Sequence, residues 1–463
     1  MKNSNFAHFY QLLKRRDHYR RLVLGGVVSQ LGDWLSYIAL SYVAVREGGG
    51  EGALGTGLAI AGVYLAHSLP NAIAAPFVGP IVDRVSRRLL ILISYACACL
   101  LTLAIWSQVE SGSLILIQGL LFMRVIMSNV GMTARQAALP SLVTPDELYT
   151  ANALNSSVWS TLFTLGVSLG GVISAVFGPQ EAILIDALTY LVSFVLVWSL
   201  PTLSPRDEAG LYARSEQDAA EGDSRKMSAD ARAMIDDISR APIVEQYEGE
   251  LRTKDTVAAK LTEEESQSYR LADAWRFAIA RPAMWIPLFA KSPIAFFNGS
   301  GWIALNLIAV ERNPEMSAMF IGLFTAARGV GMGVGPAILS AQRTANPIYA
   351  QWLTLGALFG FIAAKVMWVQ VMMLFIWGLG NGVNWVSSTA SLQSHTPPHL
   401  LGRMTSLDFL CFTVCQSIAT LSAGWLFDTM GSINIMVVSV SAVGVVGLSV
   451  LSVIDWRVRR QRS

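Results

Sequence analysis

Twelve apolar runs, each long enough to cross a lipid bilayer, dominate this sequence. A membrane-spanning helix needs roughly 20 mostly apolar residues, and it must pair its own backbone groups because the hydrocarbon core offers no water. Six runs precede a long polar stretch and six follow it, at residues 22–45, 56–80, 89–109, 113–132, 153–176, 182–200, 284–310, 317–339, 348–367, 371–391, 404–427 and 433–454. The pattern predicts an all-α membrane protein with twelve transmembrane helices in two six-helix bundles.

Composition agrees with this prediction and excludes several classes of protein. Hydrophobic residues make up 53% of the 463 residues and charged residues only 14%, where an ordinary soluble domain has roughly a quarter charged residues. A net charge of +2 gives no strongly basic face, so we expect no nucleic-acid partner. All four cysteines lie inside apolar runs without a His or carboxylate array, so neither a metal nor another cofactor is expected.

The positions of lysine and arginine predict the orientation. They concentrate in the N-terminal segment, the loop at 84–88 and the C-terminal tail, whereas the opposite loops hold only Arg46 and Arg312. Because basic loops stay in the cytoplasm, both termini are expected to be cytoplasmic in a bacterial inner (plasma) membrane. The expected units are a segment at 1–21, a bundle at 22–200, a polar cytoplasmic linker at 201–283, a bundle at 284–455 and a tail at 456–463.

The two halves share short motifs in the same order. Residues 78–80 and 334–336 both read Val-Gly-Pro, and a Thr-Pro pair precedes the fifth run at Thr144 and the eleventh at Thr396. Parallel repeats of this kind are typical of transporters built from two halves around a central site.

The loop after the second run carries a charged motif. In residues 79–88, Gly79 permits close helix packing, Asp83 can bond a helix N-terminus or an arginine, and Arg84 and Arg88 can hold the loop in the cytoplasm. The alternative interpretation is an anchor that only sets the orientation.

These residues match the signature G-x-x-x-D-R-x-[GS]-R-[RK] of the major facilitator superfamily, which the chain resembles over almost its whole length. The resemblance implies the major facilitator fold and a charge relay of Asp83, Arg84 and Arg88 that locks the cytoplasmic gate. Residues 30–35 and 184–189 look like the branch of macrolide and enterobactin exporters, which implies proton-coupled export of a drug or siderophore-like compound. Residues 166–171 are similar to the family's antiporter motif, with close helix packing as the alternative.

Three charged residues near the middle of predicted spans are the first candidates for a central site, since such charges usually face a cavity or a partner. Asp33 is expected to be either a proton-coupling residue or one half of a permanent ion pair, and Arg124, which belongs to the same half, can pair with it. Arg124 also falls where the family's span-four motif has an arginine implicated in proton coupling. Arg328 either binds an anionic substrate group or only neutralises Asp33 or caps backbone carbonyls.

Polar and aromatic residues of other spans complete the expected substrate site. A mixed wall suits an amphipathic organic molecule better than a bare ion, and the candidates are Asn155, Asn298, Asn381, Asn384 and Trp385. The sequence contains no G-x-x-x-x-G-K-[ST] motif for nucleotide binding, so coupling to an ion gradient is expected.

We therefore expect a monomeric secondary transporter whose partners are a small organic substrate, protons and the bilayer. Alternatives within transport are facilitated diffusion, proton-coupled uptake and lysolipid flipping by the same fold. An alternative of another class is a membrane sensor or receptor that uses the long polar stretch. An enzyme is not expected, because no H-E-x-x-H motif or nucleophile–base set is visible.

Overall fold

A computed structural model describes most of the chain. The described residues are 10–48, 55–82, 84–110, 113–201, 271–281, 284–339, 347–396 and 400–462. The predicted N-terminal segment is described only from Tyr10 on, and most of the predicted linker, 202–270, lies outside the described residues.

The N-terminal half consists of six long helices. Their sequences are apolar along most of their length, as a helix surrounded by lipid and other helices requires. They are α2 (Asp17–Gly48), α3 (Thr56–Val82), α4 (Arg87–Gln108), α5 (Leu114–Ala138), α6 (Pro145–Val176) and α7 (Pro179–Trp198), with a short 3-10 turn, η1 (Leu139–Ser141), before α6.

The C-terminal half repeats this arrangement after the linker. Two short helices, α11 (Leu271–Ile279) and α12 (Trp285–Phe289), lead into six long ones. The long helices are α13 (Ser292–Arg312), α14 (Ser317–Leu339), α15 (Pro347–Ala363), α16 (Met367–His395), α17 (Leu401–Met430) and α18 (Ile433–Arg462).

The described residues thus confirm the predicted fold class. They contain ten helices long and apolar enough to span a membrane and two shorter apolar helices, within α6 and α15, which gives twelve. The seventh predicted span differs, because it is divided into α12 and α13. Pro293 lies in the first turn of α13, where its missing N–H costs nothing, so a new helix begins just before it. The break leaves Lys291 at the N-cap of α13.

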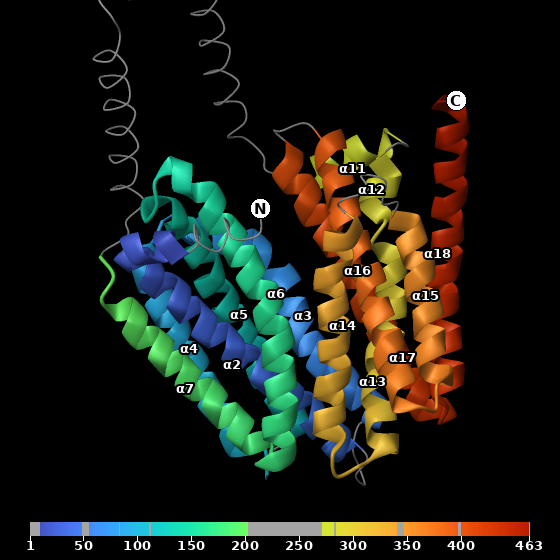
Figure 1. Cartoon of the computed structure of the whole chain (residues 1–463), viewed down its shortest axis with the longest axis horizontal. Coiled ribbons are helices and arrows are strands. Elements are labelled where there is room, and N and C mark those ends of the chain that lie inside the picture. Colours follow the sequence, from blue (N-terminus) through green and yellow to red (C-terminus); the bar gives the residue numbers. More distant parts are fainter. Residues whose placement is uncertain are drawn as a thin grey trace, which may run out of the picture.

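The two halves lie side by side, α2 to α7 in one and α13 to α18 in the other (Figure 1). Helix α2 begins and α18 ends at the same end of the molecule, which we call the termini end, and the opposite end is called the far end. Across the interface, α3 packs against α17 and α6 against α14.

Glycines allow these helices to approach closely near the far end. A Cβ atom added to Gly171 of α6 would lie 2.8 Å from the Cα of Gly322 on α14. A Cβ on Gly424 of α17 would lie 2.5 Å from the carbonyl oxygen of Gly57 on α3. Larger residues would push the halves apart at both places. The packing role expected as an alternative for residues 166–171 is therefore filled by Gly171.

Candidate transport site

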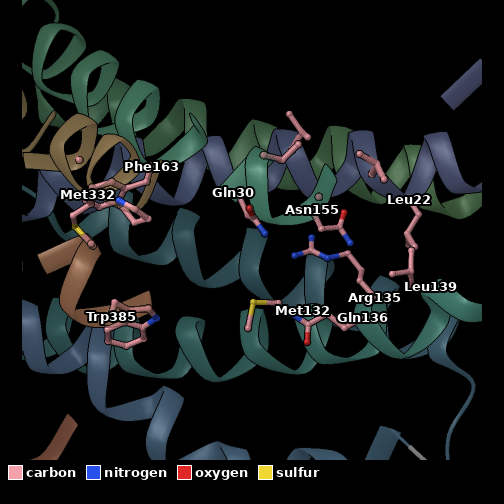
Figure 2. Close-up of a pocket in the computed structure, with 18 of the residues that line it drawn as sticks. Leu22, Gln30, Met132, Arg135, Gln136, Leu139, Asn155, Phe163, Met332 and Trp385 are labelled. Carbon is pink, nitrogen blue, oxygen red and sulfur yellow. The ribbon is translucent and has the colours of Figure 1, made fainter. Parts of the chain in front are cut away.

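A large cavity lies between the two halves. Its volume is about 880 Å³, and its walls come from α2, α5, η1 and α6 of one half and from α14 and α16 of the other. It extends from Phe163, in the middle of α6, to Tyr19 and Leu139 at the termini end. Figure 2 shows Gln30, Arg135 and Asn155 among the side chains of its wall. The mixture of apolar and polar groups is that of a site for an amphipathic organic molecule.

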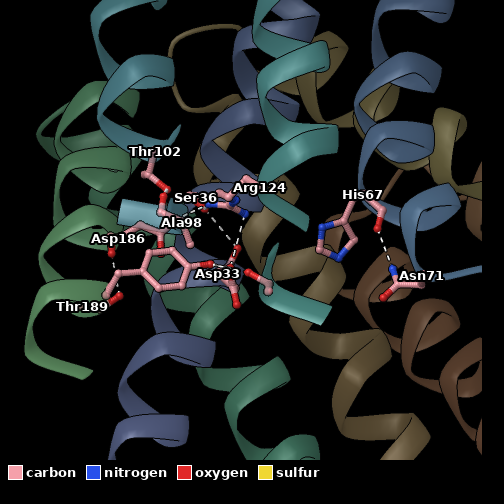
Figure 3. A network of polar contacts seen from close by, with 11 residues as sticks. Asp33, Ser36, His67, Asn71, Ala98, Thr102, Arg124, Asp186 and Thr189 are labelled. Atoms are coloured by element: carbon pink, nitrogen blue, oxygen red, sulfur yellow. Dashed lines mark hydrogen bonds and ion pairs between the residues drawn. The ribbon is translucent and has the colours of Figure 1, made fainter. Parts of the chain in front are cut away.

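A charge cluster joins three helices of the N-terminal half. Arg124 of α5 lies between Asp33 of α2 and Asp186 of α7 (Figure 3). Its Nη2 is 3.4 Å from Asp33 Oδ1, while its Nη1 donates hydrogen bonds to Asp186 Oδ2 and, at 2.9 Å, to Ser36 Oγ. The ion pair expected between Asp33 and Arg124 is therefore present, and Asp186 is a third member that the sequence analysis did not include.

Close packing of α2 on α7 brings this cluster together. A Cβ atom on Gly32 would lie 3.1 Å from the Cα of Asp186 and would overlap the side chains of Asp186 and Thr189. The two segments at 30–35 and 184–189, far apart in the sequence, thus meet at Gly32. Only glycine leaves room for the Asp186 carboxylate between these helices.

Exposure separates the roles of the two carboxylates. The side chains of Arg124 and Asp186 are 1% and 0% exposed, whereas that of Asp33 is 23% exposed. Asp33 lines a second, smaller cavity of about 110 Å³, which shares Gln30, Met132 and Arg135 with the large one. Within the described cluster, Asp33 is thus the carboxylate that a proton can reach from the cavities, while Asp186 is sealed against Arg124.

Tyr190 is hydrogen-bonded to the cluster, and Arg135 forms a separate set of hydrogen bonds nearby. The Tyr190 hydroxyl donates to Asp33 Oδ1 at 2.5 Å and lies 2.8 Å from the hydroxyl of Ser128. Arg135 Nη1 donates to the Tyr95 hydroxyl at 2.5 Å and to Ser29 Oγ at 3.1 Å. Arg135 lines both cavities, so a basic residue borders each of them.

A second ion pair lies in the C-terminal half. Lys291 Nζ donates hydrogen bonds to Asp408 Oδ2 of α17 and, at 2.9 Å, to Thr389 Oγ1 of α16. The same amino group lies 4.5 Å from the ring centroid of Trp385, which lines the large cavity. The side chains of Lys291 and Asp408 are almost fully buried.

The structure separates the asparagines and the tryptophan predicted for the substrate site into two groups, while Arg328 is partly buried in α14. Trp385 and Asn155 line the cavity. Asn298, Asn381 and Asn384 are buried inside the C-terminal half. Asn298 Oδ1 accepts hydrogen bonds of 2.9 Å from both Trp377 Nε1 and Asn381 Nδ2, and Asn384 Oδ1 accepts one of 3.3 Å from a glutamine of α15.

The far end of the molecule is closed by contacts between the halves. The carboxylate of Asp428, near the end of α17, accepts hydrogen bonds from the backbone N–H groups of Gly57 at 2.7 Å and Leu58 at 2.8 Å, in the first turn of α3. Tyr37 of α2 stacks on Trp302 of α13 with their ring centroids 5.4 Å apart. A carboxylate at a helix N-terminus satisfies free N–H donors, so Asp428 ties the two halves together.

The predicted gate motif lies at the termini end, toward which the large cavity extends. Gly79 is part of α3, Arg84 is exposed in the turn that follows, and Asp83 lies outside the described residues. Arg88 donates a 2.5 Å hydrogen bond to the carbonyl of Trp198 in its own half. In this structure Arg88 therefore joins α4 to α7 within one half.

Sequence reasoning missed three functional candidates. Arg135 lies beyond the fourth predicted span, which ends at residue 132, but α5 continues to Ala138 and brings it to the cavity. Asp186 and Asp428 carry a signal, because a carboxylate in or beside an apolar span needs a partner. Their partners are 62 and 371 residues away, so the sequence alone does not identify them.

Two helical bundles around a cavity of mixed polarity, with paired charged residues inside the bundles, are typical of membrane transporters. The sequence model of the Major Facilitator Superfamily matches residues 22–420. The chain therefore belongs to this superfamily and is a multi-pass membrane transport protein, not an enzyme.

Two curated relatives are also MFS-type transporters, and their alignments cover less of the chain than the family model does. The chain is 22% identical over 191 residues to the uncharacterized MFS-type transporter YkuC of Bacillus subtilis (strain 168), and 23% identical over 190 residues to YfiS of the same organism. These alignments cover 41% of this chain and 42% and 44% of the two relatives. The chain thus matches less than half the length of each.

Solved structures share the fold over nearly the whole chain. A peptide transporter POT in complex with sulfate has a TM-score of 0.64 at 14% identity, covering 96% of this chain and 95% of that one. A POT family transporter in complex with 5-aminolevulinic acid gives 0.65 at 13%, covering 96% of both chains. The nucleoside transporter NupG gives 0.64 at 10%, covering 95% of this chain and 99% of its own.

Proposed function

We propose that this transporter exports a small organic compound in exchange for protons, by alternating access of the cavity between its halves. The observation that carries the proposal is the position of Asp33. Its carboxylate belongs to a buried ion-paired cluster and yet is 23% exposed at a cavity that adjoins the large one. A carboxylate that is both ion-paired and reachable can exchange a proton and change the charge of its surroundings.

Protonation of Asp33 would change the ion pairs inside the N-terminal half. The neutral form no longer attracts Arg124, which then keeps only Asp186 as a charged partner in the described cluster. Tyr37 follows Asp33 by one helical turn on α2 and stacks on Trp302 of the other half. A small movement of α2 is therefore passed to the far end, and the proton shifts the equilibrium between the two openings of the cavity.

The cavity supports an amphipathic substrate. Met132, Phe163, Met332 and Trp385 supply apolar and aromatic surface, and several polar side chains share the wall. In addition, the segments 30–35 and 184–189, which resemble those of macrolide and enterobactin exporters, meet at the charge cluster. A drug or siderophore-like compound is the substrate class that we propose, with Trp385 and Arg328 among its contacts and Asn298, Asn381 and Asn384 in support.

Gating would complete the cycle. We propose that the termini end faces the cytoplasm of a bacterial plasma membrane and that the residues at 201–283 connect the halves there. When the halves close at this end, Asp83, Arg84 and Arg88 form the latch, and Gly79 allows α3 to approach its neighbour. Arg88 then exchanges its bond to the Trp198 carbonyl for one in the latch. The carrier acts as a monomer.

Reconstituted vesicles test the proposal. Purified protein in liposomes of known orientation is given candidate macrolides, siderophores and organic cations, and proton movement is followed with a pH-sensitive dye. We expect substrate to move one way and protons the other. The Asp33→Asn variant should lose transport driven by the pH gradient while it still exchanges labelled for unlabelled substrate. Full coupling in Asp33→Asn would remove this residue from the mechanism, and co-movement of substrate and protons would identify uptake instead.

A further inference from the structure

Arg328 is partly buried and differs from Arg124 and Lys291, which are buried cations of the spans. It lies in the middle of α14, and its guanidinium is 4.7 Å from the ring centroid of Trp377. Two ionisable side chains of the other half, Tyr37 and Tyr64, interact with it electrostatically. Among the residues that the structure describes, no carboxylate forms an ion pair with it, and its buried Nε has no hydrogen-bond acceptor.

Charge accounting makes this arginine stand out. Arg124 is balanced by Asp33 and Asp186, and Lys291 is balanced by Asp408. Arginine stays protonated in proteins, and an isolated charge inside a membrane span is costly. The face of Trp377 offsets part of that cost, but it supplies no hydrogen-bond acceptor for the guanidinium.

A second donor without an acceptor borders the same place. Trp302 of α13 contacts both tyrosines, with its ring centroid 5.4 Å from that of Tyr37 and 6.2 Å from that of Tyr64. Its Nε1 is buried and has no partner among the described residues. An indole N–H can only donate. Two buried donors, one of them charged, therefore surround the Tyr37–Tyr64 pair and lack an acceptor.

This place adjoins the deep end of the large cavity. Gly329, the next residue of α14, and Phe163 both line the cavity. From Phe163, an aromatic series leads inward through Trp34, at a centroid distance of 4.7 Å, to His67 at 5.5 Å and on to Tyr37 at 4.5 Å. A ligand with a planar or apolar part bound at the deep end of the cavity would thus lie near the Arg328 guanidinium and the Trp302 N–H donor.

From these contacts we infer that the transported substrate carries an oxyanion, a carboxylate or a phosphate, on an apolar or aromatic body. The inference rests on the proposed transport function and specifies its substrate class. The oxyanion accepts hydrogen bonds from Arg328 and Trp302, and the apolar body packs against Phe163 and Trp34. Binding of the anion supplies the counter-charge that the protein lacks at this place.

Three probes with one aromatic body and different charges test the inference. They are 2-naphthoate, 2-naphthalenemethanol and 2-naphthylmethylamine, and their binding to the purified full chain is measured by quenching of tryptophan fluorescence. We expect 2-naphthoate to bind at least about tenfold more tightly than the alcohol, because hydrogen bonds to charged groups are the stronger ones. The amine should bind most weakly. Equal binding of the three probes to the wild-type chain would overturn the inference.

Substitutions locate the preference. Arg328→Gln should bring the affinity for 2-naphthoate down to that of the alcohol and leave the alcohol unchanged. Arg328→Lys keeps the charge but loses the planar fork, so it should retain part of the preference. Arg276→Gln, at an exposed arginine of α11, is the matched control and should bind all three probes as the wild type does. An unchanged preference in Arg328→Gln would contradict the assignment. If Arg328→Gln does not fold, the inference is still tested by the order of affinities in the wild type and by the reduced preference expected in Arg328→Lys.

Competition identifies the source of the oxyanion. Displacement of 2-naphthoate by an anionic lysophospholipid, but not by inorganic phosphate, would indicate a lipid headgroup, and the reverse result would indicate a soluble compound. Either result keeps the oxyanion at Arg328. Binding is measured without a membrane gradient, so anion preference without proton flux would refute only the proposed coupling. Proton-coupled transport without anion preference would refute only the present inference.

Discussion

Removing the Asp428 carboxylate should weaken the closure of the far end. This side chain accepts two backbone hydrogen bonds, from Gly57 and Leu58, and so caps α3 of one half with α17 of the other. Replacing a capping Asp by Ala costs about 0.5–2 kcal/mol. Asp428 is exposed, so water replaces part of what is lost and we expect about 1 kcal/mol, a factor of about five in the ratio of closed to open far ends.

Spin-label distances can measure this shift. Labels at Glu110, after α4, and at Glu315, before α14, stand on exposed positions of the two halves at the far end. In a background without native cysteines, Asp428→Ala should increase a population with a longer distance. Asp428→Asn keeps an oxygen acceptor and should shift the ratio less. Glu311→Ala, at another exposed acid of this end, is the control. The capping argument fails if Asp428→Ala leaves the distances unchanged or if Glu311→Ala shifts them equally.

Three further predictions concern stability, measured as thermal unfolding of the purified protein. Asp186→Asn should destabilise the fold by about 3–5 kcal/mol, because it removes the buried partner of an arginine. Asp33→Asn, at a partly exposed site, should cost less. Equal losses would contradict the separation of their roles. Lys291→Met should cost a similar amount, and the double variant with Asp408→Leu should recover most of it; additive losses would refute this. At the surface, partial burial raises the pKa of Glu147, but hydrogen bonds from Thr144 and Arg16 outweigh it and hold that pKa below its ordinary value. The carboxylate therefore stabilises the fold above about pH 4.3 and loses this effect as the pH falls further. The unfolding midpoint of Glu147→Gln should accordingly change less between about pH 6 and about pH 3 than that of the wild type.

The helices could be predicted from the sequence because the bilayer imposes their length. Each apolar run became a long helix or, at the seventh, a short and a long one. The exception has a local cause, since Pro293 starts a new helix, but a proline alone does not show that the break will leave Lys291 beside Asp408. Helix existence is therefore a local property, whereas helix ends and breaks depend on the neighbouring helices.

The sequence predicted members of the candidate site only where the charge of a residue and its position along a span were enough to pair it with another residue. Asp33 and Arg124 could be paired because both lie near mid-span in one half. Asp186 shares one buried face of α7 with Tyr190 and Ser193, at helical spacing. This polar stripe predicts a buried side, but the sequence does not show that α2 and α5 cover it. The rotation of each helix about its own axis decides which side chains face a neighbour. In this way Asn298 packs against Trp377, while Trp385 reaches the cavity. Periodicity gives little information in a span that is covered on every side by apolar groups.

The coupling of Asp33 to the cavity has a direct test in the accessibility of Gln136. This residue is exposed in the wall of the large cavity, near the termini end. In a background without native cysteines, Gln136→Cys is labelled with a membrane-impermeant thiol reagent added on that side, at several pH values and with rates corrected for thiolate content. We predict a labelling rate that changes with pH in the presence of Asp33 and is constant in Asp33→Asn. A pH dependence that persists unchanged without the carboxylate would contradict the account.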